Sequence, residues 1–130
     1  MSNQAQNPNV KNDKIYDLAE RTALFGESII EFMSCIPTTN INNPLINQLV
    51  RSSTSIGANY MEADGAESKK DFNHKIGICK KEAKETMHWI RMIAKANSGK
   101  TIECRKLWNE AHELTLIFSS IIRPKPKVQS

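Results

Sequence analysis

Cysteine is scarce in this sequence, and the three cysteines that it has lie far apart. Cys35, Cys79 and Cys104 are odd in number and form no Cys-x-x-Cys pair, which argues against a disulfide framework and against a structural zinc site. We expect all three to be small, partly buried apolar side chains. No apolar run approaches the roughly 20 residues of a membrane span, and the polar start of the chain is unlike a signal peptide. A cytoplasmic protein with no membrane partner is expected.

Strand patterns are also missing, because no stretch alternates apolar and polar residues with a period of two. What is present is the balance of a soluble globular domain, with 39% apolar and 25% charged residues in a chain of 130. We expect one folded domain over residues 13–122. A disordered polar leader, 1–12, precedes it, and a basic tail that contains proline, 123–130, follows it.

Apolar residues recur at alternating spacings of three and four in four stretches, which predicts four amphipathic helices. Asp13, Asn43 and Ser68 are the expected N-caps of the first three. The short connections at 64–67 and 97–100 favour antiparallel neighbours. We therefore predict an all-α fold, a single antiparallel up-down-up-down four-helix bundle. Its helices are expected at about 13–35, 43–63, 68–96 and 101–122. Leu107, Ala111, Leu114, Phe118 and Ile121 are expected to face inward from the last helix.

The second predicted helix is rich in small and polar residues. Gly57 costs roughly 1 kcal/mol there relative to alanine, which indicates that another backbone comes close; the same is expected at Gly26 and Gly77. Apolar residues cover a wide arc of this helix, and we favour a subunit interface over deeper burial within one chain. On the opposite flank four polar residues line up along the helix. They are Arg51, Ser55, Asn59 and Glu62.

These four residues have two interpretations. They form either a polar seam that pairs with neighbouring helices or subunits, or a site for a ligand or phosphate. The structural interpretation is favoured, because the sequence has no glycine-rich phosphate loop.

The same helix resembles a known family. The sequence Arg51-Ser52-Ser53-Thr54-Ser55 followed by Asn59-Tyr60-Met61-Glu62, and later Ser68-Lys69-Lys70-Asp71-Phe72, is similar to a pattern in the four-helix-bundle proteins of 23S ribosomal RNA intervening sequences. The accessory variability proteins of diversity-generating retroelements are related to them. The resemblance covers about residues 16–122, and the glycine that usually follows the motif glutamate is displaced here to Gly65.

What the resemblance implies is a ring, typically a pentamer with a central channel. For the retroelement relatives it also implies binding to nucleic acid and to a reverse transcriptase. It supplies an architecture more than a function.

Enzymatic sites find little support in the residues. A di-iron bundle needs two Glu-x-x-His pairs, but Glu85 and His88 are expected to face outward, and the matching place on the last helix has Asn109 and His112. Cys104 lies near a helix start, where the pKa of a thiol can fall, yet no histidine is spaced to activate it. We expect no catalysis, no metal and no cofactor.

Basic residues are the better indication of function, since the formal net charge is +4. Asp71, Glu82 and Glu85 interleave with the lysines of the third helix, as on an ordinary solvated face, but repetition in a ring would add weak patches together. The candidate nucleic-acid-binding residues are Lys69, Lys70, Lys75, Lys80, Lys81, Lys84, Arg91, Lys95, Arg105 and Lys106.

Two hypotheses follow. The first is a homo-oligomeric ring, pentameric by the resemblance, that binds RNA or DNA through phosphates without sequence specificity. The second is a scaffold or adaptor that binds another protein and no nucleic acid.

Overall fold

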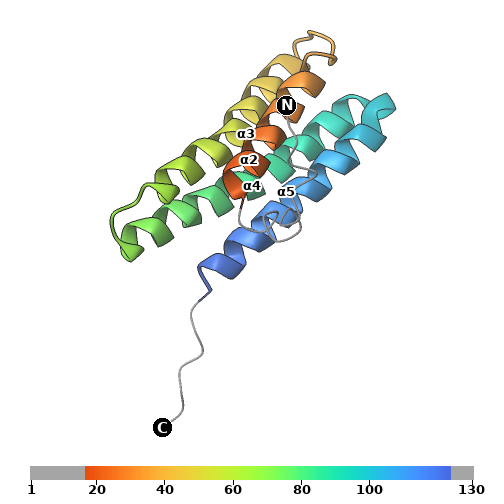
Figure 1. Cartoon of the computed structure of the whole chain (residues 1–130). Coiled ribbons are helices and arrows are strands. Elements are labelled where there is room, and N and C mark those ends of the chain that lie inside the picture. Colours follow the sequence, from red (N-terminus) through yellow and green to blue (C-terminus); the bar gives the residue numbers. More distant parts are fainter. Residues whose placement is uncertain (1–16, 124–130) are drawn as a thin grey trace, which may run out of the picture.

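Asp17 starts the first helix of the computed structural model, which describes residues 17–123 (Figure 1). Its side chain accepts a hydrogen bond from the amide of Glu20, and α2 then spans Leu18–Met33. The expected N-cap Asp13 lies outside the described residues, as do the predicted leader and most of the predicted tail. The helix ends two residues earlier than predicted, because Cys35 and Ile36 bond three residues back in a tighter turn.

The second helix, α3, spans Asn42–Asp64 and begins one residue before the predicted start. Asn43 is not its N-cap, so that prediction is wrong. Thr39 Oγ1 instead accepts from the amide of Asn42 at 2.9 Å. The side-chain amide of Asn42 donates to Pro37 O and to Asn97 Oδ1, the latter at 3.1 Å. In return, Asn97 Nδ2 donates to Asn42 Oδ1 at 2.9 Å. Side chains from the preceding loop and from the end of another helix therefore fix this helix start.

The two remaining helices follow the predicted boundaries closely. α4 spans Lys69–Ala96, and Ser68 caps it as predicted, with its hydroxyl accepting from the amide of Asp71 at 3.0 Å. A short 3-10 turn, η2, covers Ser98–Lys100, and α5 spans Thr101–Ile121. No helix among residues 17–123 combines the length and apolar character that a bilayer crossing needs.

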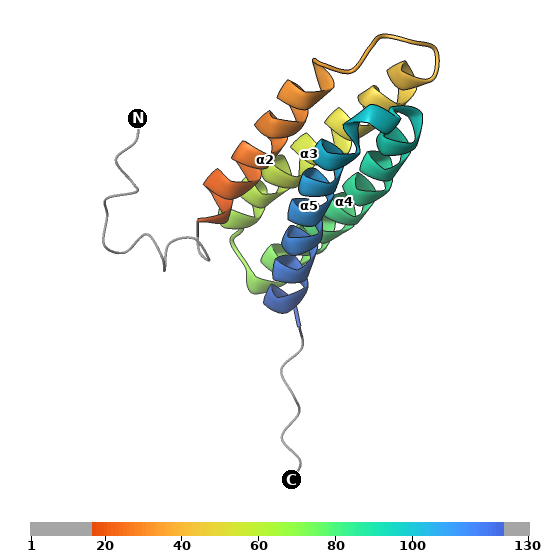
Figure 2. The same ribbon diagram turned by 90° about the vertical axis from the view of Figure 1, so that its right-hand side faces the viewer.

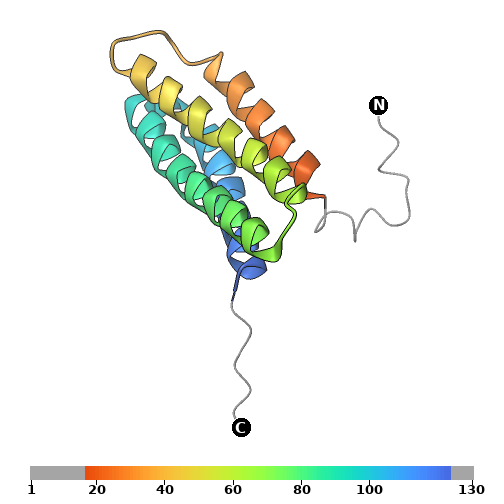
Figure 3. The ribbon, with the colours of Figure 1, turned by 90° about the vertical axis from the view of Figure 1, so that its left-hand side faces the viewer.

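The described helices form an all-α four-helix bundle in which consecutive helices run in opposite directions (Figure 2). Side-chain pairs between α3 and α4 agree with this arrangement: Asn42 at the start of α3 meets Asn97, whereas Glu62 near its end meets Lys75. α3 packs against both α2 and α4, and α4 packs against α5 (Figure 3). In contrast, α2 and α5 touch at few points, so the bundle is less closed along that edge.

The core lies along the middle of the bundle and draws side chains from all four helices. Most of the predicted stripe of α5 is buried, but Ile121 is 38% exposed, because the last turn of the helix extends past the end of the packed region (Figure 2). Cys79 and Cys104 are buried as expected, whereas Cys35 is exposed in the turn after α2. The largest fully buried apolar side chains are Ile29, Leu49, Ile56, Ile76, Ile90, Ile93, Leu114 and Phe118.

Candidate functional site

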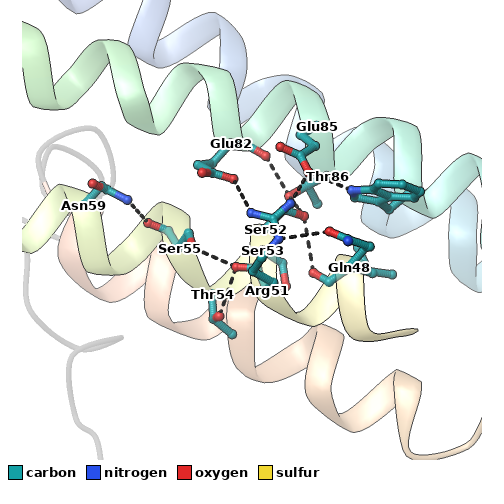
Figure 4. Close-up of polar contacts among 12 residues, drawn as sticks. Gln48, Arg51, Ser52, Ser53, Thr54, Ser55, Asn59, Glu82, Glu85 and Thr86 are labelled. Carbon is teal, nitrogen blue, oxygen red and sulfur yellow. Dashed lines mark hydrogen bonds and ion pairs between the residues drawn. The ribbon is translucent and has the colours of Figure 1, made fainter. Parts of the chain in front are cut away.

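Arg51 joins α3 to α4 through two carboxylates. Its Nη1 lies 3.4 Å from Glu82 Oε1, its Nη2 forms an ion pair with Glu85, and its Nε donates to Gln48 Oε1 at 3.0 Å (Figure 4). Glu85 also accepts from the indole of Trp89 at 2.9 Å. Glu82 is only 9% exposed, so Arg51 provides the charge that a buried carboxylate requires. This is the pairing that the structural interpretation of the seam predicts.

The rest of the seam bonds to its own helix or to α4. Ser55 donates to Arg51 O at 2.7 Å, and Asn59 donates to Ser55 O at 2.8 Å (Figure 4). Glu62 forms an ion pair with Lys75 on α4 at 2.7 Å. Each of the four side chains therefore already has a partner within the described chain.

Sequence reasoning missed the polar partners on α4. Glu82 and Glu85 were expected on a solvated face, but both contact Arg51. Beside them Thr86 Oγ1 donates to Ser52 Oγ at 2.9 Å, and both hydroxyls are fully buried. The available signal was Arg51 itself, the only cation of α3, which predicts an acidic partner on a neighbouring helix.

The thiols of the core are poor nucleophiles. Burial raises the pKa of Cys79 to about 12, and the thiol lies 3.6 Å from Ile56 O. Burial also raises the pKa of Cys104, because loss of hydration outweighs any effect of the nearby helix start. Within residues 17–123 no three His, Cys, Asp or Glu side chains cluster as metal ligands.

Five of the ten candidate basic residues recur along one side of α4. Together with two histidines and a glycine they occupy spacings of four and three, which place them on a single face of the helix. All but the glycine are exposed, and no acidic residue falls in the series. We call this series the α4 row: Lys70, His74, Gly77, Lys81, Lys84, His88, Arg91 and Lys95.

Two of the three acidic residues of α4 are paired with a cation of α3. Glu82 and Glu85 face Arg51, while the five cations of the α4 row form no ion pair within the described chain. The remaining candidates are dispersed. Lys75 is paired with Glu62, Lys80 is half-buried and Lys69 is exposed at the start of α4. Arg105 and Lys106 are exposed on α5.

A groove of about 280 Å³ lies between α2 and α3. Small residues line most of it, and the exposed side chains of Ile30 and Met61 add apolar surface. A Cβ at Gly26 would lie 3.6 Å from Thr54 Cγ2, and a Cβ at Gly57 would lie 3.3 Å from Thr22 Oγ1. The predicted close approach thus occurs at Gly26 and Gly57. It is wrong for Gly77, where an added Cβ would meet no atom of another described helix within 4 Å.

Carboxylates accompany this groove. Glu27 lines it, and Glu20 and Glu31 are exposed on the same helix. The only cation of α2, Arg21, turns away to α5, where it binds Glu110 at 2.8 Å and Glu113 at 3.1 Å. These carboxylates raise the pKa of Arg21. Since Arg51 likewise turns to α4, the outer face of α2 and α3 has acidic and apolar groups but no unpaired cation among the described residues.

Comparison with known proteins identifies a matching family and a solved structure with the same fold. The model of the 23S rRNA-intervening sequence proteins matches residues 13–120. A solved structure of a protein with unknown function from the S23 ribosomal protein family of Bacteroides thetaiotaomicron is 28% identical, with a TM-score of 0.71 over 82% of this chain and 98% of that chain. Among curated proteins none matches.

Proposed function

Because the chain belongs to the 23S rRNA-intervening sequence protein family, we propose that it is a non-enzymatic, ring-forming homo-oligomer that binds nucleic acid through the α4 row. The pentamer remains the expected ring, from the family resemblance. The observation that carries the nucleic-acid proposal is the exposed, unpaired series of cations on α4. A cation that has no carboxylate partner is free to exchange its counterions for phosphates.

The length of the α4 row supports a polyanion as the ligand. From Lys70 to Lys95 the helix rises roughly 38 Å at 1.5 Å per residue, which is about one turn of a B-form duplex. Lysine and arginine contacts to phosphate carry no base information. None of the aromatic side chains within residues 17–123 is exposed, so base stacking adds little, and we expect binding that is led by phosphates and insensitive to sequence.

The non-enzymatic part of the proposal is supported by what the polar groups already do. Arg51, Glu82 and Glu85 satisfy one another between α3 and α4. The thiols of Cys79 and Cys104 have raised pKa values and are buried. An ion pair that neutralises a buried carboxylate between two packed helices is an ordinary structural arrangement.

The test is titration of labelled duplex RNA and duplex DNA with the full chain, followed by fluorescence anisotropy between about 50 and 200 mM salt. The critical variant is Lys81→Gln/Lys84→Gln. If both side chains contact phosphate, its slope of log K against log salt on duplex DNA should be shallower by about 1.8, or about 0.9 for each lost contact. The control, Lys11→Gln/Lys14→Gln, removes the same charge from the part of the sequence that precedes α2 and should retain the slope.

Three results would contradict the proposal separately. Absence of binding at low salt would contradict the proposed nucleic-acid binding and favour the alternative, a scaffold for another protein. Equal slopes for the two variants would place the phosphate contacts elsewhere than on the α4 row. Light scattering that gave the mass of one chain, 14.7 kDa, would remove the ring.

A further inference from the structure

The groove between α2 and α3 is an apolar surface that one chain leaves uncovered. Ile30 is 48% exposed and Met61 is 59% exposed, and both line the groove beside Ala23, Gly26 and Ala58. Small residues on the two helices allow a side chain to enter between the ridges. A partner that filled the groove would bury these groups, so the chemistry of the surrounding surface decides which partner fits.

The charges around the groove oppose symmetric pairing of two grooves. Glu20, Glu27 and Glu31 are exposed on α2, and the cations of α2 and α3 are both paired elsewhere. Packing one groove against another would place carboxylates opposite carboxylates, which opposes association. The complementary surface must therefore combine unpaired cations with a protruding apolar side chain.

One described helix has this combination. α4 has many cations but no large apolar side chain among the exposed ones. α5 has the exposed cations Arg105 and Lys106 together with Ile102 and Leu116, which are 73% and 55% exposed. Ile102, Lys106 and Leu116 are four and then ten residues apart, so they share one face of α5. Glu113 shares this face, and its charge is paired with Arg21 of the same chain.

We propose that the groove between α2 and α3 receives the α5 face of a second copy of this chain, with Leu116 in the groove and Arg105 and Lys106 near the carboxylates of α2. This inference rests on the proposed function, in which copies of the chain assemble. Two different surfaces make the contact, so it is heterologous, and its repetition does not stop at a dimer; where the rotation between successive copies closes, the result is a ring. The α4 row takes no part and stays available to phosphates.

Two variants and their mixture test the contact. Ala23→Arg places a long cation in the groove at an exposed position, and Leu116→Gln replaces the apolar side chain on α5. Each alone should lower the mass in light scattering from that of the oligomer to one chain of 14.7 kDa. Each variant keeps one intact surface, so an equimolar mixture should form a heterodimer and nothing larger. The matched control is Leu24→Gln, which changes an equally exposed leucine (51%) that does not line the groove; it should keep the oligomer.

The outcomes separate this inference from the proposed function. A wild-type oligomer that both variants leave intact would overturn the contact and keep the ring. Two monomeric variants that fail to dimerise on mixing would overturn the heterologous contact. Circular dichroism shows whether either variant has lost its helices. A wild-type oligomer that responds as expected but binds no RNA would support the contact and contradict the nucleic-acid function.

Discussion

Helix α3 contacts α2 and α4 through different kinds of interaction. Toward α2 the contact is close and apolar, with Gly26 and Gly57 letting the helices approach. Toward α4 it is polar, with Arg51 bound to two carboxylates and the buried hydroxyls of Ser52 and Thr86 bonded to each other. The two interfaces thereby separate the charges of the molecule. The polar interface uses carboxylates of α4 that would otherwise weaken the α4 row, while α2 keeps its own carboxylates at the surface.

Arg51→Ala should lower the stability most, because it removes the ion pairs between α3 and α4. It leaves Glu82, whose side chain is 12% exposed, without its cation. Loss of one partner from a fully buried pair costs about 3–5 kcal/mol; the side chain of Arg51 is 46% exposed, so we expect a loss of about 2 kcal/mol in urea unfolding. Arg21→Ala is the control, since its partners are 32% and 65% exposed, and it should cost about 0.5–1 kcal/mol. Equal losses would show that Glu82 does not depend on Arg51.

Thr86→Val should have the next effect. It keeps the shape of the side chain but removes the hydroxyl that donates to Ser52 at 2.9 Å. A buried polar group that loses its partner costs about 1–2 kcal/mol. Thr54→Val is the matched change on the other side of α3, where the hydroxyl is exposed and bonds to its own helix. Chemical denaturation should place Thr54→Val within about 0.5 kcal/mol of the wild type, and a reversed order would contradict the polar description of the α3–α4 interface.

Alkaline pH near 10 should weaken the same interface by about 1.4 kcal/mol, which corresponds to one pKa unit. Burial raises the pKa of Cys79 to about 12, above its ordinary value of 9.0. Between these values the unfolded state releases a proton that the folded state retains, so stability that is complete below the unfolded pKa is lost as pH rises. At pH near 10 the wild type should lose more stability, relative to neutral pH, than Cys79→Ala does. Parallel pH profiles would mean that the buried thiol does not contribute.

Two glycine substitutions should have the smallest effects, a gain in stability at Gly77 and little net change at Gly57. Gly77→Ala lies on the α4 row, where an added methyl meets no described atom within 4 Å, so the helix should gain about 0.5–1 kcal/mol. Gly57→Ala places its methyl 3.3 Å from Thr22 Oγ1, and the tight contact should offset that gain. Thermal melts of the two variants measure the difference. A gain at Gly57 as large as at Gly77 would show that the approach of α2 and α3 is looser than the glycines imply.

The sequence predicts the fold better than the polar interior. Spacing and caps place the four helices, since apolar periodicity and a serine cap such as Ser68 are local signals. The predicted start of α3 is wrong because its hydrogen bonds come from outside the helix. Thr39 lies in the preceding loop, and Asn97 lies at the end of α4. In the sequence, Glu82 and Thr86 look like solvent-exposed residues of a helix. They are buried only because α3 packs against them. Sequence alone does not separate the cations of the α4 row from Glu82 and Glu85. The structure does, because both carboxylates pair with Arg51.

The weak contact between α2 and α5 sets the order in which the molecule opens. α2 packs chiefly on α3 and is tied to α5 through Arg21, whereas α4 has a helix on each side. Native-state hydrogen exchange should therefore show the amides of α2 opening in a partial step, below the free energy of global unfolding that protects α4. A neighbouring subunit seated in the groove would suppress that step, because binding to the closed form alone stabilises it. Protection of α2 would then rise with protein concentration, and the least anchored helix would report on assembly.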